Sequence, residues 1–341
     1  MTKSNLDSTK TSSYDFFLPE DLIAKYPATP ADSARLLIYD RKSDTIKHDI
    51  FKNILDYIDD CAVVLNNTKV IKARIFGHKS TGAKIELLIN KPLVNNYFLV
   101  YIRGKVKLDD ILHFDGFSAK VIALNLDGSR VVEFYDQKSI DFDRLIRYLD
   151  DIGHVPLPPY INRADIKQDE QDYQTLFAKY SGSVAAPTAS LHFTDELLAR
   201  FRSRFDMGFV TLHVGAGTFK PVDVESIDKH IMHSEQYLID DSTKELIESK
   251  QKLLAVGTTV TRTIEFYHRC KAQSGECNLF LNPNNPPQRV DYLLTNFHLP
   301  KSTLIMLVAS FVGVEKTLEL YNEAIKNKYR FYSYGDAMLV L

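Results

Sequence analysis

The sequence predicts an α/β main domain whose chain is interrupted by a smaller, inserted all-β domain. Strand-like apolar runs alternate with helix-like segments up to residue 70 and again from residue 150, which is typical of crossover units. Short strands separated by glycines fill the region between them, which is typical of a small barrel. At 341 residues the chain also exceeds the usual size of one hydrophobic core.

We therefore expect a discontinuous α/β domain with a mixed or largely parallel sheet, formed by residues 14–70 and 150–341. The all-β, barrel-like insertion is expected at residues 71–149. Residues 1–13 are almost all polar and predict a flexible tail.

In the first half of the α/β domain, Pro19 predicts the start of a short helix. Apolar runs then predict a strand at 35–41, a helix at 51–58 and a buried strand at 61–67. The insertion is expected to contain the strands "ARIFGHK", "AKIELLI", "YFLVYIR", "SAKVIAL" and "RVVEFYD".

A helix over 142–153 is expected before the α/β alternation resumes. Thr194 and Ser302 have the residue type and place of helix caps. The expected strands are 208–214, 252–256, 291–297 and 336–341, and the expected helices are 195–205, 260–270, 303–312 and 315–328.

Composition excludes several classes of protein. Hydrophobic residues at 45% and charged residues at 25% are typical of a soluble globular chain. The longest apolar segment, 304–314, is shorter than the ~20 residues that span a bilayer, and no signal-peptide pattern is present. Cys61, Cys270 and Cys277 lack metal or disulfide spacing. We expect a cytoplasmic monomer with no membrane contact.

The net charge of −2 means that any contact with nucleic acid must be local. The stretch 69–84 is basic and contains no acidic residue. It is either a solvated strand edge, where lysines deter aggregation, or a phosphate-binding patch. The candidate nucleic-acid-binding residues are Lys69, Lys72, Arg74, Lys79 and Lys84.

The stretch "TLHVGAGTFKPV" (211–222) is not a dinucleotide-binding loop. A dinucleotide fingerprint needs a third glycine and a following helix, whereas Lys220 and Pro221 stand there. On this evidence Gly215 and Gly217 mark either an ordinary turn or a place where a ligand approaches the backbone.

Histidines occur in several patterns that could carry chemistry. His230 and His233 with Glu235 could bind zinc, but their spacing is not a standard zinc pattern, so acid–base chemistry is favoured and no metal is predicted. His192, His213 and His298 lie in or beside apolar sequence, where a histidine is often only a core residue.

Three other segments have the composition of binding loops. "VGTT" (256–259) follows a strand and opens a helix, a cradle for a carboxylate or phosphate to which Arg262 would add charge; a plain capped loop is the alternative. "SVAAPTASLHF" (183–193) is rich in small residues, which suit either a flat ligand or close packing. "TNFHLPKST" (295–303) follows the end of a strand, where open α/β sheets bind ligands.

Long motifs run in order from Leu18 to Met338: "LPEDLIAKYP", "SARLL", "LNNTKVIKARIFG", "GHVPLPPYI", "DYQTLFAKYSGSVAAPTASLHF", "VTLHVGAGTFKPV", "HIMHSE", "AVGTT", "LLTNFHLPKSTLIMLVASF" and "YRFYSYGDAM". Together they resemble the S-adenosylmethionine:tRNA ribosyltransferase-isomerases of queuosine biosynthesis. Departures from the family pattern are local, at Ser181, Ser190, Val260-Thr261 and residues 281–289.

The resemblance implies a transfer of the ribosyl part of S-adenosylmethionine to 7-aminomethyl-7-deazaguanine at the tRNA wobble position. Isomerisation gives epoxyqueuosine, and adenine and methionine leave. S-adenosylmethionine is then a consumed co-substrate, and no cofactor is expected. A base must remove a proton from C5′ and an acid must protonate adenine. The candidates, with their roles left open, are His213, His230, His233, Glu235 and His298, with Asp336 as a further carboxylate.

The remaining predictions concern substrate contacts. Phe193, Phe219 and Phe297 are candidates to surround the sulfonium, and the resemblance favours the phosphate-binding interpretation of stretch 69–84. The alternatives are a methyltransferase using S-adenosylmethionine and a non-catalytic RNA-binding module. The expected substrate-binding residues are Ala186, Pro187, Thr188, His192, Phe193, Gly215, Gly217, Gly257, Thr258, Thr259 and Asn296.

Overall fold

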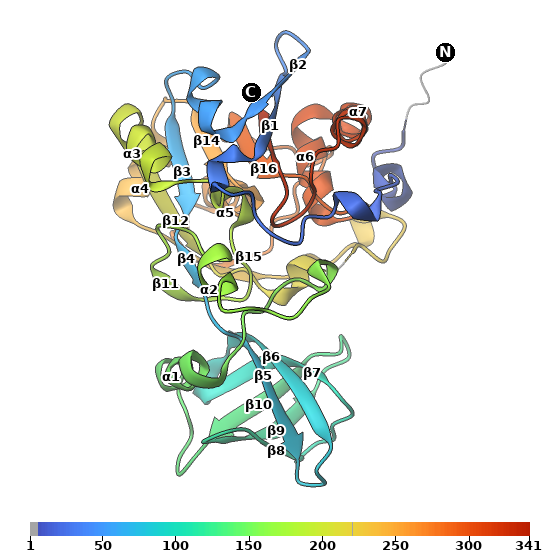
Figure 1. The fold of residues 1–341 in the computed structure, drawn as a ribbon, viewed down its shortest axis with the longest axis vertical. Helices are drawn as coiled ribbons and strands as arrows, with labels where there is room; N and C mark the ends of the chain where they lie inside the picture. The colour runs from blue at the N-terminus through green and yellow to red at the C-terminus, as the bar shows by residue number, and fades with distance from the viewer. Residues whose placement is uncertain (1–5, 220) are drawn as a thin grey trace.

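The structure, a computed structural model, describes residues 6–219 and 221–341, and its main domain is built on one mixed sheet (Figure 1). Parallel pairs join β12 to β3, β3 to β14, β14 to β16 and β17 to β1, and the other neighbours are antiparallel. The predicted fold class is confirmed. The strand order is β15 (Ser274–Cys277), β13 (Glu235–Ile239), β12 (Met207–Leu212), β3 (Ala62–Asn66), β14 (Leu253–Val256), β16 (Tyr292–Asn296), β17 (Ala337–Val340), β1 (Arg35–Asp40) and β2 (Thr45–Ile50).

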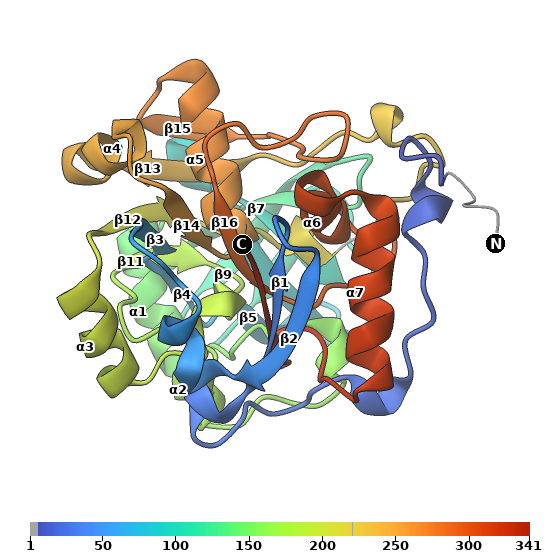
Figure 2. The same cartoon turned by 90° about the horizontal axis from the view of Figure 1, so that it is seen from above.

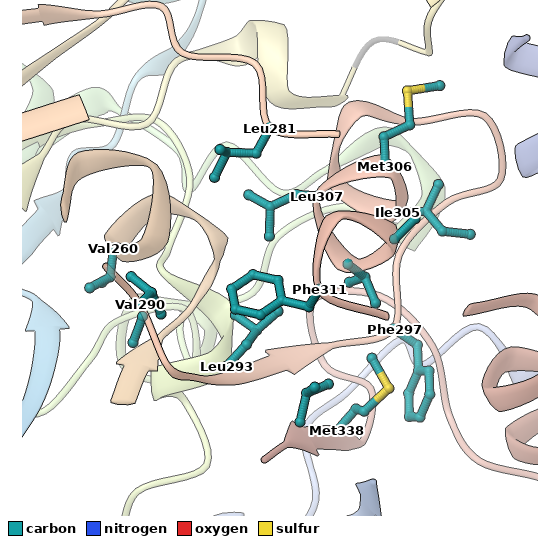
Figure 3. Close-up of a cluster of buried hydrophobic side chains, with 14 of the residues drawn as sticks. Val260, Leu281, Val290, Leu293, Phe297, Ile305, Met306, Leu307, Phe311 and Met338 are labelled. Carbon is teal, nitrogen blue, oxygen red and sulfur yellow. The ribbon is translucent and has the colours of Figure 1, made fainter. Parts of the chain in front are cut away.

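Helices cover both faces of this sheet (Figure 2). Successive residues of the central strands are buried in opposite cores, as the period of a strand requires. The larger core contains side chains of α5, α6 and α7, and Figure 3 shows Val260, Leu293, Leu307, Phe311 and Met338 within it. The opposite core contains α3. The helices are α1 (Phe142–Ile152), α2 (Asp169–Asp172), α3 (Asp195–Arg204), α4 (Asp241–Glu248), α5 (Thr258–Cys270), α6 (Thr303–Val312) and α7 (Val314–Lys326).

The predicted helix caps are present. The side chain of Thr194 accepts a hydrogen bond from the N–H of Leu197, and Ser302 accepts one from Ile305. Segment 51–58 forms a 3₁₀ helix, Phe51–Asp56, in place of the expected α-helix, and β2 was not predicted. The remaining 3₁₀ helices are Thr11–Tyr14, Glu20–Leu22, Ala31–Ser33, Val94–Asn96, Pro159–Ile161, Thr188–Ser190, Ala216–Phe219 and Ile227–Lys229.

The insertion is a closed barrel below the main domain (Figure 1). Alternate side chains of its strands fill an apolar interior, and Leu145 and Leu149 of α1 pack into the same core. The barrel strands, in order around it, are β10 (Arg130–Tyr135), β7 (Tyr97–Arg103), β6 (Lys84–Pro92), β5 (Arg74–Lys79), β8 (Ile111–His113) and β9 (Ser118–Leu124).

Two chain crossings join the barrel to the main domain, and they lie side by side. β4 (Thr68–Val70) pairs in parallel with β11 (Tyr180–Ser183). Nearer the barrel, the N–H of His154 donates to the carbonyl of Arg74 (2.8 Å), and the N–H of Arg74 donates to the carbonyl of His154 (3.3 Å). The barrel is thus held by hydrogen-bonded strands.

The predicted flexible tail is wrong for residues 10–13. Thr11 is buried, its hydroxyl donates to the carbonyl of Val224 (2.6 Å), and Lys10 forms a bridge with Ser226. Tertiary hydrogen bonds therefore order a segment whose composition is polar. Residues 1–5 lie outside the described residues. Among the helices that the structure describes, none is long and apolar enough to cross a membrane.

Candidate functional site

Two neighbouring cavities collect most of the predicted site residues. Cavity A lies beyond the C-terminal ends of β14 and β16, the edge at which open α/β sheets bind ligands. Its wall also includes Tyr160 and Tyr332, whose ring centroids are 4.5 Å apart. The predicted residues that line it are Ala186, Pro187, Thr188, Gly257, Thr258, Thr259, Asn296 and His298.

The floor of cavity A contains the start of α5. Gly257 has φ of 102°, a conformation that favours glycine, and it turns the chain from β14 into the helix. The positive end of the helix dipole therefore lies at this cavity and favours an anionic group. The volume of cavity A is about 60 Å³.

Asn296 presents an unpaired acceptor in this wall. Its Nδ2 donates to the carbonyl of Tyr332 (3.2 Å) and lies 3.3 Å from Nε2 of His192. Its Oδ1 is buried and has no hydrogen-bond partner among the described residues. Burial, followed by the charge of Arg330, lowers the pKa of His192 to about 3, so its ring is neutral and accepts from Asn296.

This arrangement corrects two predictions. His192 lies behind Asn296 and orients it, and is not among the residues that line either cavity. Phe193 packs between Phe51 and Phe201 in the core beneath α3, with ring centroids 5.4 and 5.0 Å away. Both were expected to contact substrate, but the apolar flank of their loop is used for packing.

His298 lines cavity A as a neutral imidazole. Its Nε2 lies 2.8 Å from Oγ1 of Thr295, and burial lowers the pKa of His298 to about 3. Phe297, next to it, lines the same cavity and packs against Phe331. Asp336 is buried elsewhere, where it accepts from the N–H groups of Arg35 and Arg330.

Cavity B lies at the junction of the two domains and has a free volume of about 220 Å³. His213 lines it with Nδ1 2.8 Å from Oγ1 of Thr68, and burial lowers the pKa of His213. Gly215 and Glu235 are the other predicted residues there, and the barrel contributes Asn90, Lys91 and Pro92.

The segment 213–218 separates the two cavities. His213 and Gly215 line cavity B, whereas Val214 and Thr218 line cavity A. Over residues 213–215 the chain is outside any helix and successive residues face opposite cavities, and the 3₁₀ helix Ala216–Phe219 then places Thr218 in cavity A. The stretch "TLHVGAGTFKPV" is therefore a wall with a cavity on each side.

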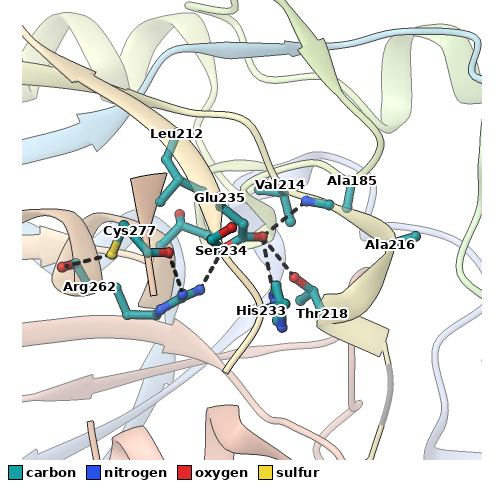
Figure 4. A network of polar contacts seen from close by, with 12 residues as sticks. Ala185, Leu212, Val214, Ala216, Thr218, His233, Ser234, Glu235, Arg262 and Cys277 are labelled. Atoms are coloured by element: carbon teal, nitrogen blue, oxygen red, sulfur yellow. Dashed lines mark hydrogen bonds and ion pairs between the residues drawn. The ribbon is translucent and has the colours of Figure 1, made fainter. Parts of the chain in front are cut away.

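A buried carboxylate fixes this wall (Figure 4). Oε1 of Glu235 accepts from the N–H of Gly215 (3.0 Å) and the hydroxyl of Thr218 (3.2 Å), and Oε2 accepts from Arg262 (2.5 Å). Burial raises the pKa of Glu235, but the charge of Arg262 and a nearby His233 outweigh it and hold the pKa at about 2. Glu235 is thus permanently ionised at neutral pH and holds the loop, which argues against its predicted proton-transfer role.

Arg262 was expected to add charge at the start of α5, but it does not supply charge to cavity A. Its Nε donates to the carbonyl of Leu279 (3.0 Å), NH2 to that of Cys277 (3.3 Å) and NH1 to Glu235. All three of its guanidinium nitrogens are therefore occupied by these partners.

His230 and His233 line neither cavity, and only His233 contacts the loop 213–218. The His233 ring packs on Gly217, where an added Cβ would lie 2.9 Å from it, and its Nε2 is 3.5 Å from Oε1 of Glu235. His230 packs edge-on against Phe280. No group of three or more metal-ligating side chains occurs in the part of the chain that the structure describes. The side chain of Phe219 lies outside the described residues.

The predicted basic stretch does not form one free patch. Lys72 pairs with Glu170 (2.9 Å), Arg74 with Glu86 (3.4 Å) and Lys79 with Asp110 (2.7 Å). Lys69 on β4 and Lys84 on β6 are exposed and form no ion pair with any described residue.

Sequence reasoning missed Asn66, Thr68 and Asn90. Asn66 is fully buried at the end of β3, where it donates to the carbonyl of Leu212 (3.0 Å) and accepts from the N–H of Leu212 and of Thr68 (both 3.1 Å). A polar residue directly after a buried strand was the available signal for Asn66. Nothing in the local sequence marks Asn90.

Comparison with known proteins now decides the family. The model of the queuosine biosynthesis protein family matches residues 11–340. The chain belongs to this family. The resemblance drawn from the motifs is thereby confirmed.

Relatives of this queuosine biosynthesis protein match it over nearly their whole length. The S-adenosylmethionine:tRNA ribosyltransferase-isomerase of Nitratiruptor sp. is 62% identical over 98% of this chain and 100% of its own. That of Aliarcobacter butzleri is 61% identical with the same coverage. The crystal structure of S-adenosylmethionine tRNA ribosyltransferase from Thermotoga maritima is 33% identical, with a TM-score of 0.55 over 96% of this chain and 100% of that one.

Proposed function

We propose that this queuosine biosynthesis protein transfers and isomerises the ribosyl moiety of S-adenosylmethionine onto 7-aminomethyl-7-deazaguanine at the wobble position of tRNA. The products are epoxyqueuosine in the tRNA, adenine and methionine. The observation that carries the proposal is the identity of 62% with a full-length ribosyltransferase-isomerase. The convergence of the small-residue loop, the "VGTT" turn and the "TNFHLP" segment on cavity A supports it.

The reaction needs groups that can accept and donate protons near neutral pH. Burial keeps the imidazoles of His298 in cavity A and His213 in cavity B neutral, but it lowers the pKa of both and so weakens both as bases. His213 is the less buried of the two and is therefore the better candidate to accept a proton from C5′, whereas Glu235 is held by Arg262. The start of α5 suits the methionine carboxylate. S-adenosylmethionine is consumed, so the proposal includes no further cofactor.

The structure also bears on the alternatives. A methyltransferase using S-adenosylmethionine is expected to have a glycine-rich turn after its first strand. Here neither the turn after β1 (residues 41–44) nor the passage from β3 through Asn67 into β4 contains a glycine. An RNA-binding module without activity would have no use for the buried acceptor of Asn296, which has no partner among the described residues, in cavity A.

Incubation of the protein with S-adenosylmethionine and tRNA carrying the precursor base tests the proposal. Release of adenine and methionine in equal amounts is the expected result. S-adenosylhomocysteine as the product would instead identify a methyltransferase, and absence of turnover would favour the binding module.

A further inference from the structure

A β-bulge in the barrel places one side chain in cavity B. The pairing register between β6 and β7 shifts between Ile89 and Lys91, which leaves Asn90 without a partner in β7. Bulges turn a side chain out of the regular pattern and are common beside active sites. The N–H of Ala216, in the wall between the cavities, donates to Oδ1 of Asn90 (2.8 Å). The barrel therefore contacts the wall between the two cavities directly.

This contact fixes the orientation of the Asn90 amide. Because Oδ1 accepts from an N–H group, the other end of the amide must be Nδ2, which carries two donors. Within the described chain, Nδ2 of Asn90 makes no hydrogen bond, although Asn90 lines the cavity. On the main-domain side, Nδ1 of His213 is occupied by Thr68, which leaves Nε2 available.

The edge of cavity B has an exposed cation nearby that could contact the phosphates of an RNA chain. Ser181 lines cavity B and pairs in register with Lys69 of β4. Lys69 is exposed and has no ion-pair partner among the described residues. RNA is recognised mostly by taking up an unstacked base and contacting the neighbouring phosphates. Among the described residues that line cavity A there is no lysine or arginine.

On the basis of the proposed function, we infer that cavity B is the subsite for the tRNA base and cavity A the subsite for S-adenosylmethionine. Asn90 is then a specificity-determining residue. Its Nδ2 donates to the carbonyl oxygen of the deazaguanine ring, an acceptor that guanine-type bases present. The wall 213–218, with Gly215 and Gly217 lacking side chains, lies between the two substrates.

The substitution Asn90→Asp tests this inference. Aspartate keeps an oxygen for the N–H of Ala216 but replaces the donor by an acceptor that repels the base carbonyl. In the adenine-release assay we expect the KM for precursor tRNA to rise about tenfold or more, and the KM for S-adenosylmethionine to change less than twofold. Asn96→Asp adds the same charge at an exposed position of the same barrel and should change neither constant.

The opposite pattern, a raised KM for S-adenosylmethionine alone, would show that the cavities have the reverse roles. Unchanged constants would leave Asn90 as an anchor for Ala216 and overturn the inference. A second measurement needs no variant: an anticodon stem–loop whose wobble base lacks the carbonyl oxygen should bind the wild-type protein about tenfold more weakly, and equal binding would also overturn it. Failure of wild type to release adenine would refute the proposed function instead.

Discussion

Glu235 shows how one residue can be essential to a site without taking part in the chemistry. It is 2% exposed and surrounded by Arg262, His233, Thr218 and the N–H of Gly215. Its charge is compensated so completely that protonation near neutral pH is excluded. Its structural effect is to hold the loop between the two cavities against α5.

Replacement of Glu235 by glutamine is expected to lower the free energy of unfolding by about 3–5 kcal/mol at pH 7, because Arg262 would retain a buried charge without its partner. The folded-state pKa of about 2 lies below the usual 4.5. The stabilisation is therefore fully present above pH 4.5 and is lost as the pH falls towards 2. Urea unfolding of wild type and Glu235→Gln between pH 3 and 7 measures the difference in the free energy of unfolding.

The difference between wild type and Glu235→Gln should shrink as the pH falls. Glu245→Gln, at an exposed position of α4, is the control and should change stability by less than about 0.5 kcal/mol. A difference for Glu235→Gln that stays constant down to pH 3 would show that its charge is not the source of the stabilisation.

At the scale of elements, the sequence predicted correctly those features that depend on a few neighbouring residues. Thr194 and Ser302 cap their helices because capping depends on residues within one turn. The meeting of "VGTT" with "TNFHLP" followed from the rule that ligands bind beyond strand ends. The bulge at Asn90 and the partners of Arg262 depend on strand register and on residues more than ten positions away, so no window of sequence contains them.

Strand β11 carries a testable constraint on His213. Gly182 has φ of 154°, and an added Cβ would lie 2.8 Å from Nδ1 of His213. We expect Gly182→Ala to displace the imidazole from Thr68 and to lower kcat for adenine release at least tenfold. Gly128→Ala is the matched control, because Gly128 also has positive φ, 87°, but open space around it.

Both alanine variants incur the cost of backbone strain, roughly 1–2 kcal/mol. Thermal unfolding measures this shared cost, and kinetics measure the effect on His213 alone. Equal kcat values for Gly182→Ala and Gly128→Ala would show that the position of the imidazole does not limit the reaction.

At the scale of the whole molecule, the charge pattern decides where RNA can bind. The net charge of −2 gives no general attraction, and most of the basic stretch is neutralised by ion pairs. The cations of that stretch without an ion pair among the described residues are Lys69, which pairs in register with Ser181 at the rim of cavity B, and Lys84 on the barrel. Composition located the basic residues, but only the fold shows which of them have acidic partners.

Lys69→Ala is expected to weaken tRNA binding and to reduce the slope of log affinity against log salt by about 0.7–0.9, the value for one lost phosphate contact. Lys79→Ala should leave the slope unchanged, since its Nζ lies 2.7 Å from Asp110. Fluorescence anisotropy with labelled tRNA over a range of KCl concentrations measures both. Equal slopes for wild type and Lys69→Ala would place the RNA backbone elsewhere.

The paired crossings at Arg74 and His154 also bear on how such a molecule could arise. At the two ends of the inserted segment, the N of His154 lies 2.8 Å from the carbonyl oxygen of Arg74. For the main domain, the barrel is therefore equivalent to a short connection between neighbouring points of the chain. The entropic cost of closing a loop grows only slowly with its length, so a long insertion whose ends meet costs little more than a short one. A barrel could thus be gained, lost or exchanged between ancestral genes at this point without altering the register of the main sheet.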